Sequence, residues 1–327
     1  MKVLVTGADG MLGSYLVREL LARKHVVRAM IQPGSKSPTL DGLTIERNMG
    51  DLLNEKDVHR AVAGCEGVVH CAAVTNLRGD PGLVWRVNLD GTRRVVDACL
   101  THGGKRLVYV GSASSFAFGS KRSPVKDCGE FPEAYRGVAY MESKRRATEM
   151  VRNFVCCRGL NAVIVAPTFL VGGYNFRPGS SELVRGFAQG RLRVSPRGGR
   201  NFVFAGDVAY AIANALDQGE PGECYLAAGE NLTYTEFFAQ AARVIKRRAP
   251  MATAPNVLVK AMGLGGSLWE FLIGRPVEIN FLLTRLSVLS TYYNPGRAVR
   301  ELSMPQTPID RAIEESVKGL YQYGLLP

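Results

Sequence analysis

Short apolar runs alternate with stretches of helical periodicity along the first half of the chain. After the apolar run at 2–6, Leu12, Leu16 and Leu20 fall on one helical face. Alternation of this kind is typical of an α/β protein whose parallel strands are joined by helices. The pattern predicts strands at 2–6, 26–31, 43–47, 67–71, 106–112 and 162–167, and long helices at 83–100 and 140–157. We therefore expect a doubly wound parallel sheet.

The alternation is lost after the sixth expected strand. Residues 172–200 are rich in Gly, Pro and Arg, and the rest of the chain is mostly helical with Pro and Gly interruptions. A helix at 208–216 and a strand at 223–227 are expected to return to the sheet. The sequence thus predicts a nucleotide-binding type of domain from 1–170 plus 206–230. A smaller, discontinuous, mostly helical C-terminal lobe would comprise 171–205 plus 231–327.

The composition is ordinary for a folded protein, but the charge is unbalanced. The 327 residues are 46% hydrophobic, and 41 Lys and Arg against 29 Asp and Glu give a net charge of +12. A positive excess of this size favours an anionic ligand or surface as a partner. The basic residues are mostly scattered and form no RNA- or DNA-binding motif, so we expect no nucleic-acid partner.

The seven cysteines form an odd set without CxxC or Cys/His spacing, so we predict no metal site and no disulfide framework. Cys71, Cys99 and Cys156 lie within apolar patterns and are expected to be buried in a reducing cytoplasm. The chain enters its first strand at once, which leaves no room for a signal peptide. We therefore expect a cytoplasmic protein.

One later stretch, 257–273, is strongly apolar. Lys260 and Glu270 interrupt it, so we predict no transmembrane segment. The stretch is amphipathic and is followed by Arg275, which leaves peripheral membrane contact open.

A glycine-rich turn follows the first strand. Gly7 permits a tight strand-to-helix turn, and Gly10 allows the backbone to approach a pyrophosphate at the helix N-terminus. Gly13 allows the helix to pack closely on the sheet. The alternative is a plain connection between strand and helix. We expect a dinucleotide site that includes Thr6, Gly7, Asp9, Gly10, Met11, Leu12 and Gly13.

Tyr140 and Lys144 are four residues apart on an expected helix, so their side chains share a face. A free phenol has a pKa of about 10, and a neighbouring ammonium would lower that pKa by favouring the phenolate. The same ammonium could bond a nicotinamide ribose. Ser114 would polarise a reacting carbonyl oxygen while Tyr140 gives it a proton. The alternative is an ordinary amphipathic helix with a surface Tyr and Lys.

Together these motifs resemble the extended short-chain dehydrogenase/reductase family, in the NAD-dependent epimerase/dehydratase superfamily. The resemblance implies a Rossmann fold, a nicotinamide cofactor, and a homodimer formed through helices that include 83–100 and 140–157. By the family pattern Ser114, counted back from Gly119, is the catalytic hydroxyl, with Ser115 as the fallback. The segments that carry the resemblance are Thr6-Gly7-x-x-Gly10-x-x-Gly13, Gly50-Asp51-Leu52, His70-Cys71-Ala72-Ala73, Val87-Asn88-x-x-Gly91-Thr92 and Tyr140-x-x-x-Lys144.

Asn88 matches the family's Asn that supports the site. Looser motifs at 166–172 and 198–203 are most similar to the dihydroflavonol-reductase-like and 3β-hydroxysteroid-dehydrogenase-like branch.

The cofactor could be NADP or NAD. Gln32 stands where relatives carry an Arg for the 2′-phosphate of NADP, but no Asp or Glu occurs between residues 26 and 40 to mark an NAD enzyme. Arg28 and Lys36 are nearby cations, so we favour NADP. Asp51 could accept from the adenine amino group, or it could form a plain turn or helix cap. The other expected cofactor contacts are Leu52, Cys71, Ala72, Ala73, Tyr140, Lys144, Pro167 and Thr168.

The substrate side departs from the sugar-nucleotide epimerases of the family. Those enzymes commonly carry an Asn, in contact with the substrate pyrophosphate, where this chain has Ala166. Arginines between 185 and 200 form a cluster that either grips an anion or is a solvated face. The cluster consists of Arg185, Arg191, Arg193, Arg197 and Arg200, and the expected substrate contacts are Ser115, Phe116, Tyr174 and Arg200.

Three further segments have simpler interpretations. The polar segment 120–137 could close over a substrate or be a passive surface loop. Asp207 is expected to cap a helix, and the basic run 246–248 is expected to end one.

These observations predict an NAD(P)(H)-dependent oxidoreductase that interconverts a ketone and a secondary alcohol on a mainly apolar small molecule. One alternative is a nucleotide-sugar epimerase or dehydratase that recycles its bound cofactor. A second alternative is a dinucleotide-sensing protein without catalysis.

Overall fold

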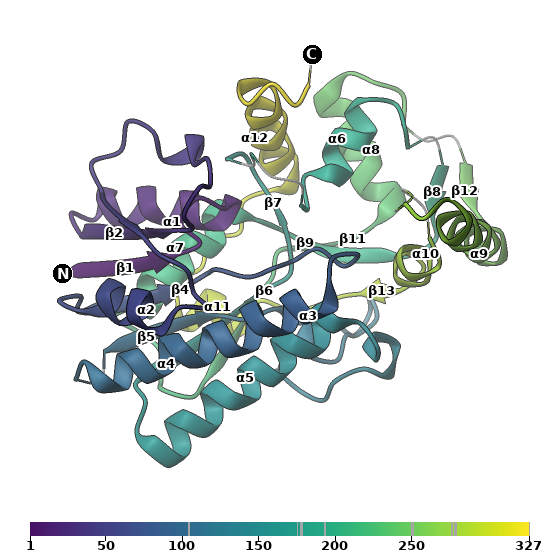
Figure 1. Cartoon of the computed structure of the whole chain (residues 1–327). Coiled ribbons are helices and arrows are strands. Elements are labelled where there is room, and N and C mark those ends of the chain that lie inside the picture. Colours follow the sequence, from purple (N-terminus) through teal and green to yellow (C-terminus); the bar gives the residue numbers. More distant parts are fainter. Residues whose placement is uncertain are drawn as a thin grey trace.

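The computed structural model describes residues 1–103, 105–174, 176, 179–192, 194–249, 252–275, 277 and 280–326. A large parallel sheet with helices on both faces forms one side of the molecule, and smaller sheets and helices form the other (Figure 1). This arrangement confirms the expected Rossmann-type α/β fold.

The large sheet has seven parallel strands in the order β10-β6-β5-β4-β1-β2-β3. The chain crosses over after β3 and continues on the other side of β1, so the carboxyl ends of β1 and β4 diverge there, which is where such sheets bind ligands. The strands are β1 (Lys2–Thr6), β2 (Val26–Ile31), β3 (Glu46–Met49), β4 (Gly67–His70), β5 (Arg106–Val110), β6 (Ala162–Pro167) and β10 (Cys224–Ala227).

Two hydrophobic clusters cover the two faces of this sheet. On one face α1, α7 and α11 pack against β1, β2, β5 and β6. On the other face α2, α4 and α5 pack against the alternate side chains of the same strands. The helices are α1 (Met11–Ala22), α7 (Ala205–Ala215), α11 (Gly296–Glu301), α2 (Glu55–Val62), α4 (Thr92–Thr101) and α5 (Ala139–Arg158).

A separate four-stranded sheet lies beyond the carboxyl end of β6. Strand β9 is at its centre and pairs with β7, β11 and β13. Helices α6, α8 and α12 pack around it through a third hydrophobic cluster. The elements are β7 (Phe169–Val171), α6 (Glu182–Ala188), β9 (Gly199–Phe204), β11 (Glu230–Thr233), α8 (Tyr234–Ile245), β13 (Ser290–Thr291) and α12 (Ile309–Gln322).

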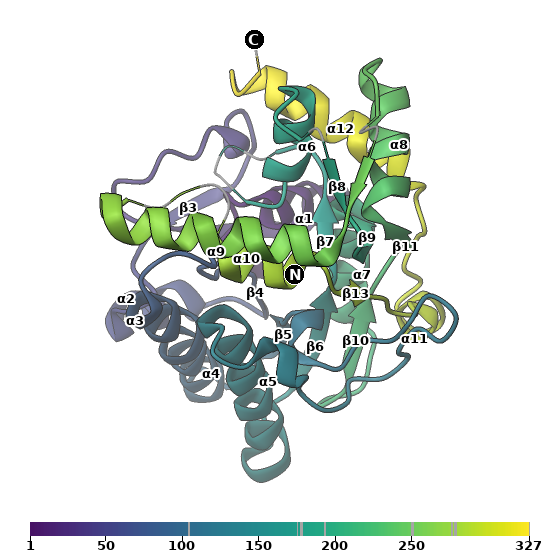
Figure 2. The ribbon, with the colours of Figure 1, turned by 90° about the vertical axis from the view of Figure 1, so that its right-hand side faces the viewer.

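The remaining elements are short, with one exception. Strands β8 (Val194–Pro196) and β12 (Ala252–Ala254) form a two-stranded ribbon, which leads into the long helix α9 (Asn256–Ile273) and its neighbour α10 (Phe281–Ser287). Figure 2 shows α9 lying across the side of the molecule that faces the viewer. No helix of the described ranges is long and apolar enough to cross a membrane.

The short elements that carry site residues are α3 (Pro81–Trp85), the π-helical segment η2 (Arg86–Gly91) and the 3-10 turns η1 (Pro38–Leu40), η3 (Ala113–Ser115) and η4 (Glu133–Tyr135).

The structure departs from the sequence-based expectations in several places. The third strand begins three residues later than expected, at Glu46, because 41–45 forms a turn and an extended connection. The expected helix at 83–100 is interrupted by the π-helical segment η2. The C-terminal lobe holds strands as well as helices. Cys99 is buried as expected and Cys71 partly so, but Cys156 is exposed.

Asp207 does not cap a helix. It lies within the first turn of α7, and its carboxylate accepts hydrogen bonds from the backbone N–H and the hydroxyl of Thr307, both at 2.7 Å. It therefore ties α7 to the segment before α12. The basic run at 246–248 does follow the end of a helix, because α8 ends at Ile245.

Candidate active site

The glycine turn between β1 and α1 has no room for side chains. Gly7 has a φ of +66°, and a Cβ added there would lie 2.7 Å from the backbone N and Cα of Ala72. A Cβ on Gly13 would lie 2.1 Å from the carbonyl oxygen of Gly7, so this glycine packs the helix against the turn itself rather than against the sheet. Gly10 is the N-cap of α1, and the first turn of that helix contains no acidic residue. The turn therefore leads into the N-terminus of a helix, whose dipole favours an anion.

A chain of hydrogen bonds connects this turn to the helix that follows β4. The hydroxyl of Thr92 donates to the carbonyl of Asn88 at 2.6 Å, so its oxygen accepts from Nε2 of His70 at 3.0 Å. Nδ1 of His70 then accepts from the Thr6 hydroxyl at 2.7 Å, and Thr6 in turn accepts from the N–H of Ala72. Burial lowers the pKa of His70 to about 3, so the imidazole is neutral.

No role was predicted for His70 from the sequence. The available signal was its position at the end of a buried strand, directly before the small residues of the cofactor passage. The structure makes it the fixed link between β1, β4 and η2.

Asn88 lies in the π-helical segment and is buried. Its amide oxygen accepts from the N–H of Val74 at 2.8 Å, and its Nδ2 donates to the Val74 carbonyl and to the Ser143 hydroxyl, each at 3.0 Å. A π-bulge commonly marks a functional position in a helix. Here the π-helical segment places the Asn88 side chain so that it joins the segment after β4 to α5, next to Lys144.

The serine turn η3 and Tyr140 form a line of hydroxyl groups. Oγ of Ser112 lies 2.7 Å from Oγ of Ser114. Ser112 also hydrogen-bonds Tyr140, which lowers the pKa of Tyr140, but burial raises it more and the pKa stays above the ordinary value. The serine that acts on the pKa of Tyr140 is therefore Ser112, which was not selected from the sequence.

Lys144 is buried, and its ammonium is held by the main chain of β5. Nζ donates to the carbonyl of Val110 at 2.6 Å and lies 4.7 Å from the centroid of the Tyr109 ring. Burial lowers the pKa of Lys144 to about 7. The expectation that Lys144 lowers the pKa of Tyr140 is wrong for this structure, since burial dominates both groups.

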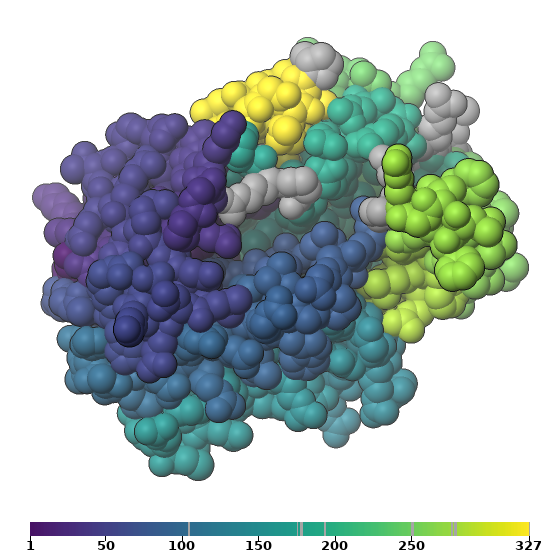
Figure 3. Space-filling model, in the orientation of Figure 1, coloured from purple at the N-terminus to yellow at the C-terminus, as the bar shows by residue number. Residues whose placement is uncertain are grey.

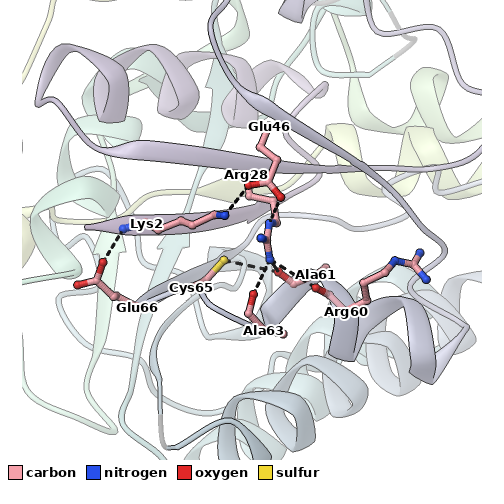
Figure 4. A network of polar contacts seen from close by, with 8 residues as sticks. All are labelled: Lys2, Arg28, Glu46, Arg60, Ala61, Ala63, Cys65 and Glu66. Atoms are coloured by element: carbon pink, nitrogen blue, oxygen red, sulfur yellow. Dashed lines mark hydrogen bonds and ion pairs between the residues drawn. The ribbon is translucent and has the colours of Figure 1, made fainter.

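Arg28 occupies a buried structural network at the far edge of β2 (Figure 4). Its Nε donates to Glu46 at 2.7 Å, and its NH1 donates to the carbonyls of Ala61 and Ala63 at 2.8 and 2.6 Å. Glu46 also pairs with Lys2 at 2.5 Å, and these two cations hold the pKa of Glu46 below its usual range. This placement removes Arg28 from the candidate phosphate ligands.

Gln32 and Lys36 lie in the exposed loop after β2, where a turn is closed by the N–H of Ser35 donating to the Gln32 carbonyl at 3.1 Å. Asp51 forms a turn, the alternative considered from the sequence, because its Oδ1 accepts from the N–H of Leu53 at 2.9 Å. The cap of α2 is Asn54, not Asp51.

The expected substrate contacts are spread over different places. Phe116 is buried within the hydrophobic core beside the sheet, and Tyr174 packs over α1, with its ring 3.8 Å from the guanidinium of Arg18. That these two residues contact a substrate stays a prediction. Ser115 is buried, and its hydroxyl is without a hydrogen-bond partner among the described residues.

Arg200 projects from β9 towards the end of β6. Its Nε donates to the Tyr234 hydroxyl at 2.6 Å, and its guanidinium lies 5.2 Å from the centroid of the Phe169 ring. Thr168, which follows Pro167 at the end of β6, donates to the Asn201 amide at 2.7 Å. Among the other arginines, Arg185 pairs with Glu182 and Arg197 is exposed, while Arg193 lies outside the described residues.

The segment 120–137 is held by the C-terminal lobe. The N–H groups of Gly119 and Val125 both donate to the carbonyl of Tyr292. The Tyr293 hydroxyl donates to the carbonyl of Ala113 at 3.1 Å, so the lobe also supports the serine turn.

An apolar cluster adjoins Tyr140. Tyr135, Val138 and Met141 pack there with Leu286 of α10. Partly buried members complete this Tyr140 cluster: Leu77, Phe118, Phe131, Ala134, Tyr140, Leu282 and Leu289. Tyr140 therefore packs against an apolar cluster that is built partly by α10.

These residues fit a nicotinamide dinucleotide. The glycine turn has no room for a Cβ at Gly7 or Gly13, and the helix N-terminus behind it suits a pyrophosphate. Cys71, Ala72 and Ala73 continue from β4 with small side chains, and burial raises the pKa of Cys71 to about 12, so the thiol is neutral. Lys144 and Tyr140 lie at the far end of this path.

Comparisons with known proteins agree with this geometry. A model of the NAD dependent epimerase/dehydratase family matches residues 3–228. Sterol demethylase protein B of Methylococcus capsulatus is 31% identical over all of both chains. A putative dihydroflavonol 4-reductase of Synechocystis is 27% identical over 98% of this chain and 94% of its own.

Among solved structures, UDP-glucose 4-epimerase of Thermus thermophilus in complex with NAD has a TM-score of 0.77 at 22% identity, over 98% of this chain and 99% of its own. This likeness is one of fold.

Proposed function

The chain belongs to the NAD dependent epimerase/dehydratase family, and on this basis we propose that it is an NAD(P)(H)-dependent oxidoreductase acting on a ketone or secondary alcohol of a mainly apolar molecule. The observation that carries this proposal is the apolar Tyr140 cluster. An apolar environment of this kind beside Tyr140 favours an apolar substrate over a nucleotide diphosphate, whose charges would lose hydration there without compensation. The names of the relatives, which refer to a sterol and a dihydroflavonol, support the same class of substrate.

The side chains of the site and the bound cofactor have separate proposed roles. When bound, the dinucleotide supplies or accepts a hydride. Tyr140 exchanges a proton with the substrate oxygen, and Ser112 connects its hydroxyl to that of Ser114, which would donate to the same oxygen. Lys144, held by Val110, is the cation for the ribose hydroxyls. Asn88 hydrogen-bonds Val74, in the segment after β4, and Ser143 of α5, and so holds these two segments together.

A panel of carbonyl compounds tests the proposal. We expect the purified protein to oxidise NADPH with keto-steroids, flavonoid-like ketones or aryl ketones, one cofactor per product, as followed by the absorbance of the reduced cofactor. Tight cofactor binding without net consumption would contradict it.

That second outcome would favour a nucleotide-sugar epimerase or dehydratase, which recycles its cofactor. Arg200 is the feature that supports this candidate, because its partly buried cation beside Tyr234 and Phe169 could receive an anionic group. Ala166, buried in β6 where an Asn is common in such enzymes, argues against it.

We further propose NADP as the preferred cofactor, with Lys36 as the cation that approaches the 2′-phosphate. Lys36→Ala should raise the Kd for NADPH about ten- to a hundredfold and leave that for NADH nearly unchanged, since one charge-assisted hydrogen bond contributes about 1.5–3 kcal/mol. Isothermal titration with both cofactors measures this. Equal losses for NADPH and NADH would rule out a role at the 2′-phosphate.

Arg28→Ala is the matched variant with the opposite expectation. It should leave NADPH affinity unchanged but lower the free energy of unfolding by about 2–3 kcal/mol, because two buried carbonyls and Glu46 lose their partner. Urea unfolding measures the loss. Arg47→Ala, which removes an exposed pair with Asp41, is the control and should cost less than about 1 kcal/mol. A selective loss of NADPH affinity in Arg28→Ala would restore its role as a phosphate ligand.

A further inference from the structure

Helix α9 is almost wholly exposed. Gly263 is its one buried residue, and the helix packs mainly on α10, where a Cβ added to Gly263 would clash with the side chain of Thr284. Figure 3 shows α9, in light green, as a ridge that protrudes from the right-hand side of the molecule. One long face of this helix is therefore available to a partner.

Two polar residues of α9, Ser267 and Glu270, face α10 rather than water. The Ser267 hydroxyl accepts from the N–H of Phe281 at 2.9 Å, and Glu270 accepts from Asn280 at 3.3 Å, both at the α10 junction. Successive residues of a helix are about 100° apart, so the opposite face is formed by the apolar positions. The outward face is thus the apolar one, the reverse of an ordinary surface helix.

The apolar face is large. Nine of the seventeen large apolar side chains that are exposed in the described part of the chain lie on α9. Trp269 is 59% exposed, Leu272 66% and Phe271 83%. A contiguous apolar patch of this kind on a protein surface marks an interaction site. We call Leu258, Met262, Leu268, Trp269, Phe271 and Leu272 the α9 face.

The charges around the α9 face are mostly positive. Residues 256–275 contain two cations, Lys260 and Arg275, and one acid, Glu270, a net charge of 2 − 1 = +1. Glu270 is turned towards Asn280, whereas Lys260 and Arg275 are exposed. Two copies of this chain would bring like charges together, while an anionic lipid surface would attract them. Charge therefore selects a bilayer over a second copy.

The chemistry of the side chains also suits lipid. Trp and Phe are preferred at the boundary between headgroups and acyl chains, and Leu buries well in the acyl layer. A protruding ridge can enter a fluid bilayer without a matching groove.

We propose that α9 lies in the plane of an anionic membrane, with the α9 face in the acyl boundary and Lys260 and Arg275 at the headgroups. Because α10 connects α9 with the Tyr140 cluster through Leu282 and Leu286, attachment places the catalytic entrance near the lipid. A lipid-dissolved substrate could then enter without crossing water. This last consequence rests on the proposed function, whereas the attachment itself does not.

Vesicle co-sedimentation of the full chain tests the attachment without any turnover. We expect binding to vesicles of phosphatidylcholine with phosphatidylserine, and weaker binding to phosphatidylcholine alone. Phe271→Glu should weaken binding at least about tenfold, because it removes a fully exposed apolar contact and adds a like charge to the anionic surface. Tyr321→Glu is the matched control, since Tyr321 is 58% exposed on α12, and it should bind as the unaltered chain does.

Trp269 supplies a second measurement. Trp85 and Trp269 are the two tryptophans of the chain, so Trp85→Phe leaves one reporter in α9. Its emission should shift to shorter wavelength when the mixed vesicles are added. Absence of both sedimentation and shift would overturn the proposal.

The rival occupant is distinguished by oligomeric state. A dimer that forms in the absence of lipid and is lost in Phe271→Glu would assign the α9 face to a second copy and overturn membrane attachment. NADPH oxidation with a water-soluble ketone, unchanged in Phe271→Glu, keeps this result separate from the test of the proposed function.

Discussion

Tyr140→Phe should reduce turnover by about 10²–10⁴-fold, because it removes the group that exchanges a proton with the substrate oxygen. The loss concerns one hydroxyl, and the ring remains in the Tyr140 cluster. Cofactor affinity should stay within about a few-fold of the original, since the substitution leaves Lys144 on the carbonyl of Val110. Steady-state kinetics together with a fluorescence titration of NADPH measure both quantities.

The matched control is Tyr225→Phe. Tyr225 lies on β10, is buried, and hydrogen-bonds the N–H of Glu220 at 3.4 Å, so the variant also loses a buried phenol hydroxyl but away from the reacting groups. Its turnover should remain near the original. Substantial turnover in Tyr140→Phe would exclude Tyr140 as the proton donor. If neither the original protein nor Tyr140→Phe shows turnover, and both bind the cofactor equally well, the dinucleotide-sensing alternative gains support.

Lys144→Met should impair turnover and cofactor binding together. The Met side chain still fills the buried position of Lys144. The variant lacks the ammonium that donates to the carbonyl of Val110 and that we expect at the ribose. A charge-assisted hydrogen bond contributes about 1.5–3 kcal/mol, so the Kd for NADPH should rise about ten- to a hundredfold. Calorimetry and kinetics on one preparation measure the two effects. A variant that binds cofactor normally would remove the ribose role.

The same variant should change how stability depends on pH in the cofactor-free protein. Burial lowers the pKa of Lys144 from 10.5 to about 7 in the folded chain. Below that pH both folded and unfolded chains hold the proton; between about 7 and 10.5 the unfolded chain holds it and the folded chain does not. The free energy of unfolding should therefore rise with pH across this window in the original protein, relative to Lys144→Met. Parallel profiles from urea unfolding would contradict the buried, readily deprotonated Lys144.

The hydroxyl line from Tyr140 through Ser112 to Ser114 changes the interpretation of the serine motif. Counting from Gly119 by family resemblance selects Ser114, and the structure adds Ser112 as the group that touches Tyr140. Spacing along the chain cannot distinguish these serines, because η3 is a tight turn in which alternate hydroxyls converge.

The α9 face was visible in the sequence as an apolar stretch with two charges, but its orientation was not. Helical periodicity shows that one face is apolar, and that face normally covers a core. Only the contacts of Ser267 and Glu270 with the α10 junction show that the polar side is the covered one.

What the sequence determined by itself is local. The strands, the glycine turn and the pairing of Tyr140 with Lys144 on one helix follow from periodicity, from the steric demands of Gly7 and Gly13, and from helix geometry, all of which act over a few residues. What only the tertiary structure decided depends on residues far apart in the chain. Arg28 is withdrawn from the cofactor because Glu46, Ala61 and Ala63 surround its guanidinium. Burial by the whole fold lowers the pKa of Lys144 and raises that of Tyr140, and no local pattern carries that information.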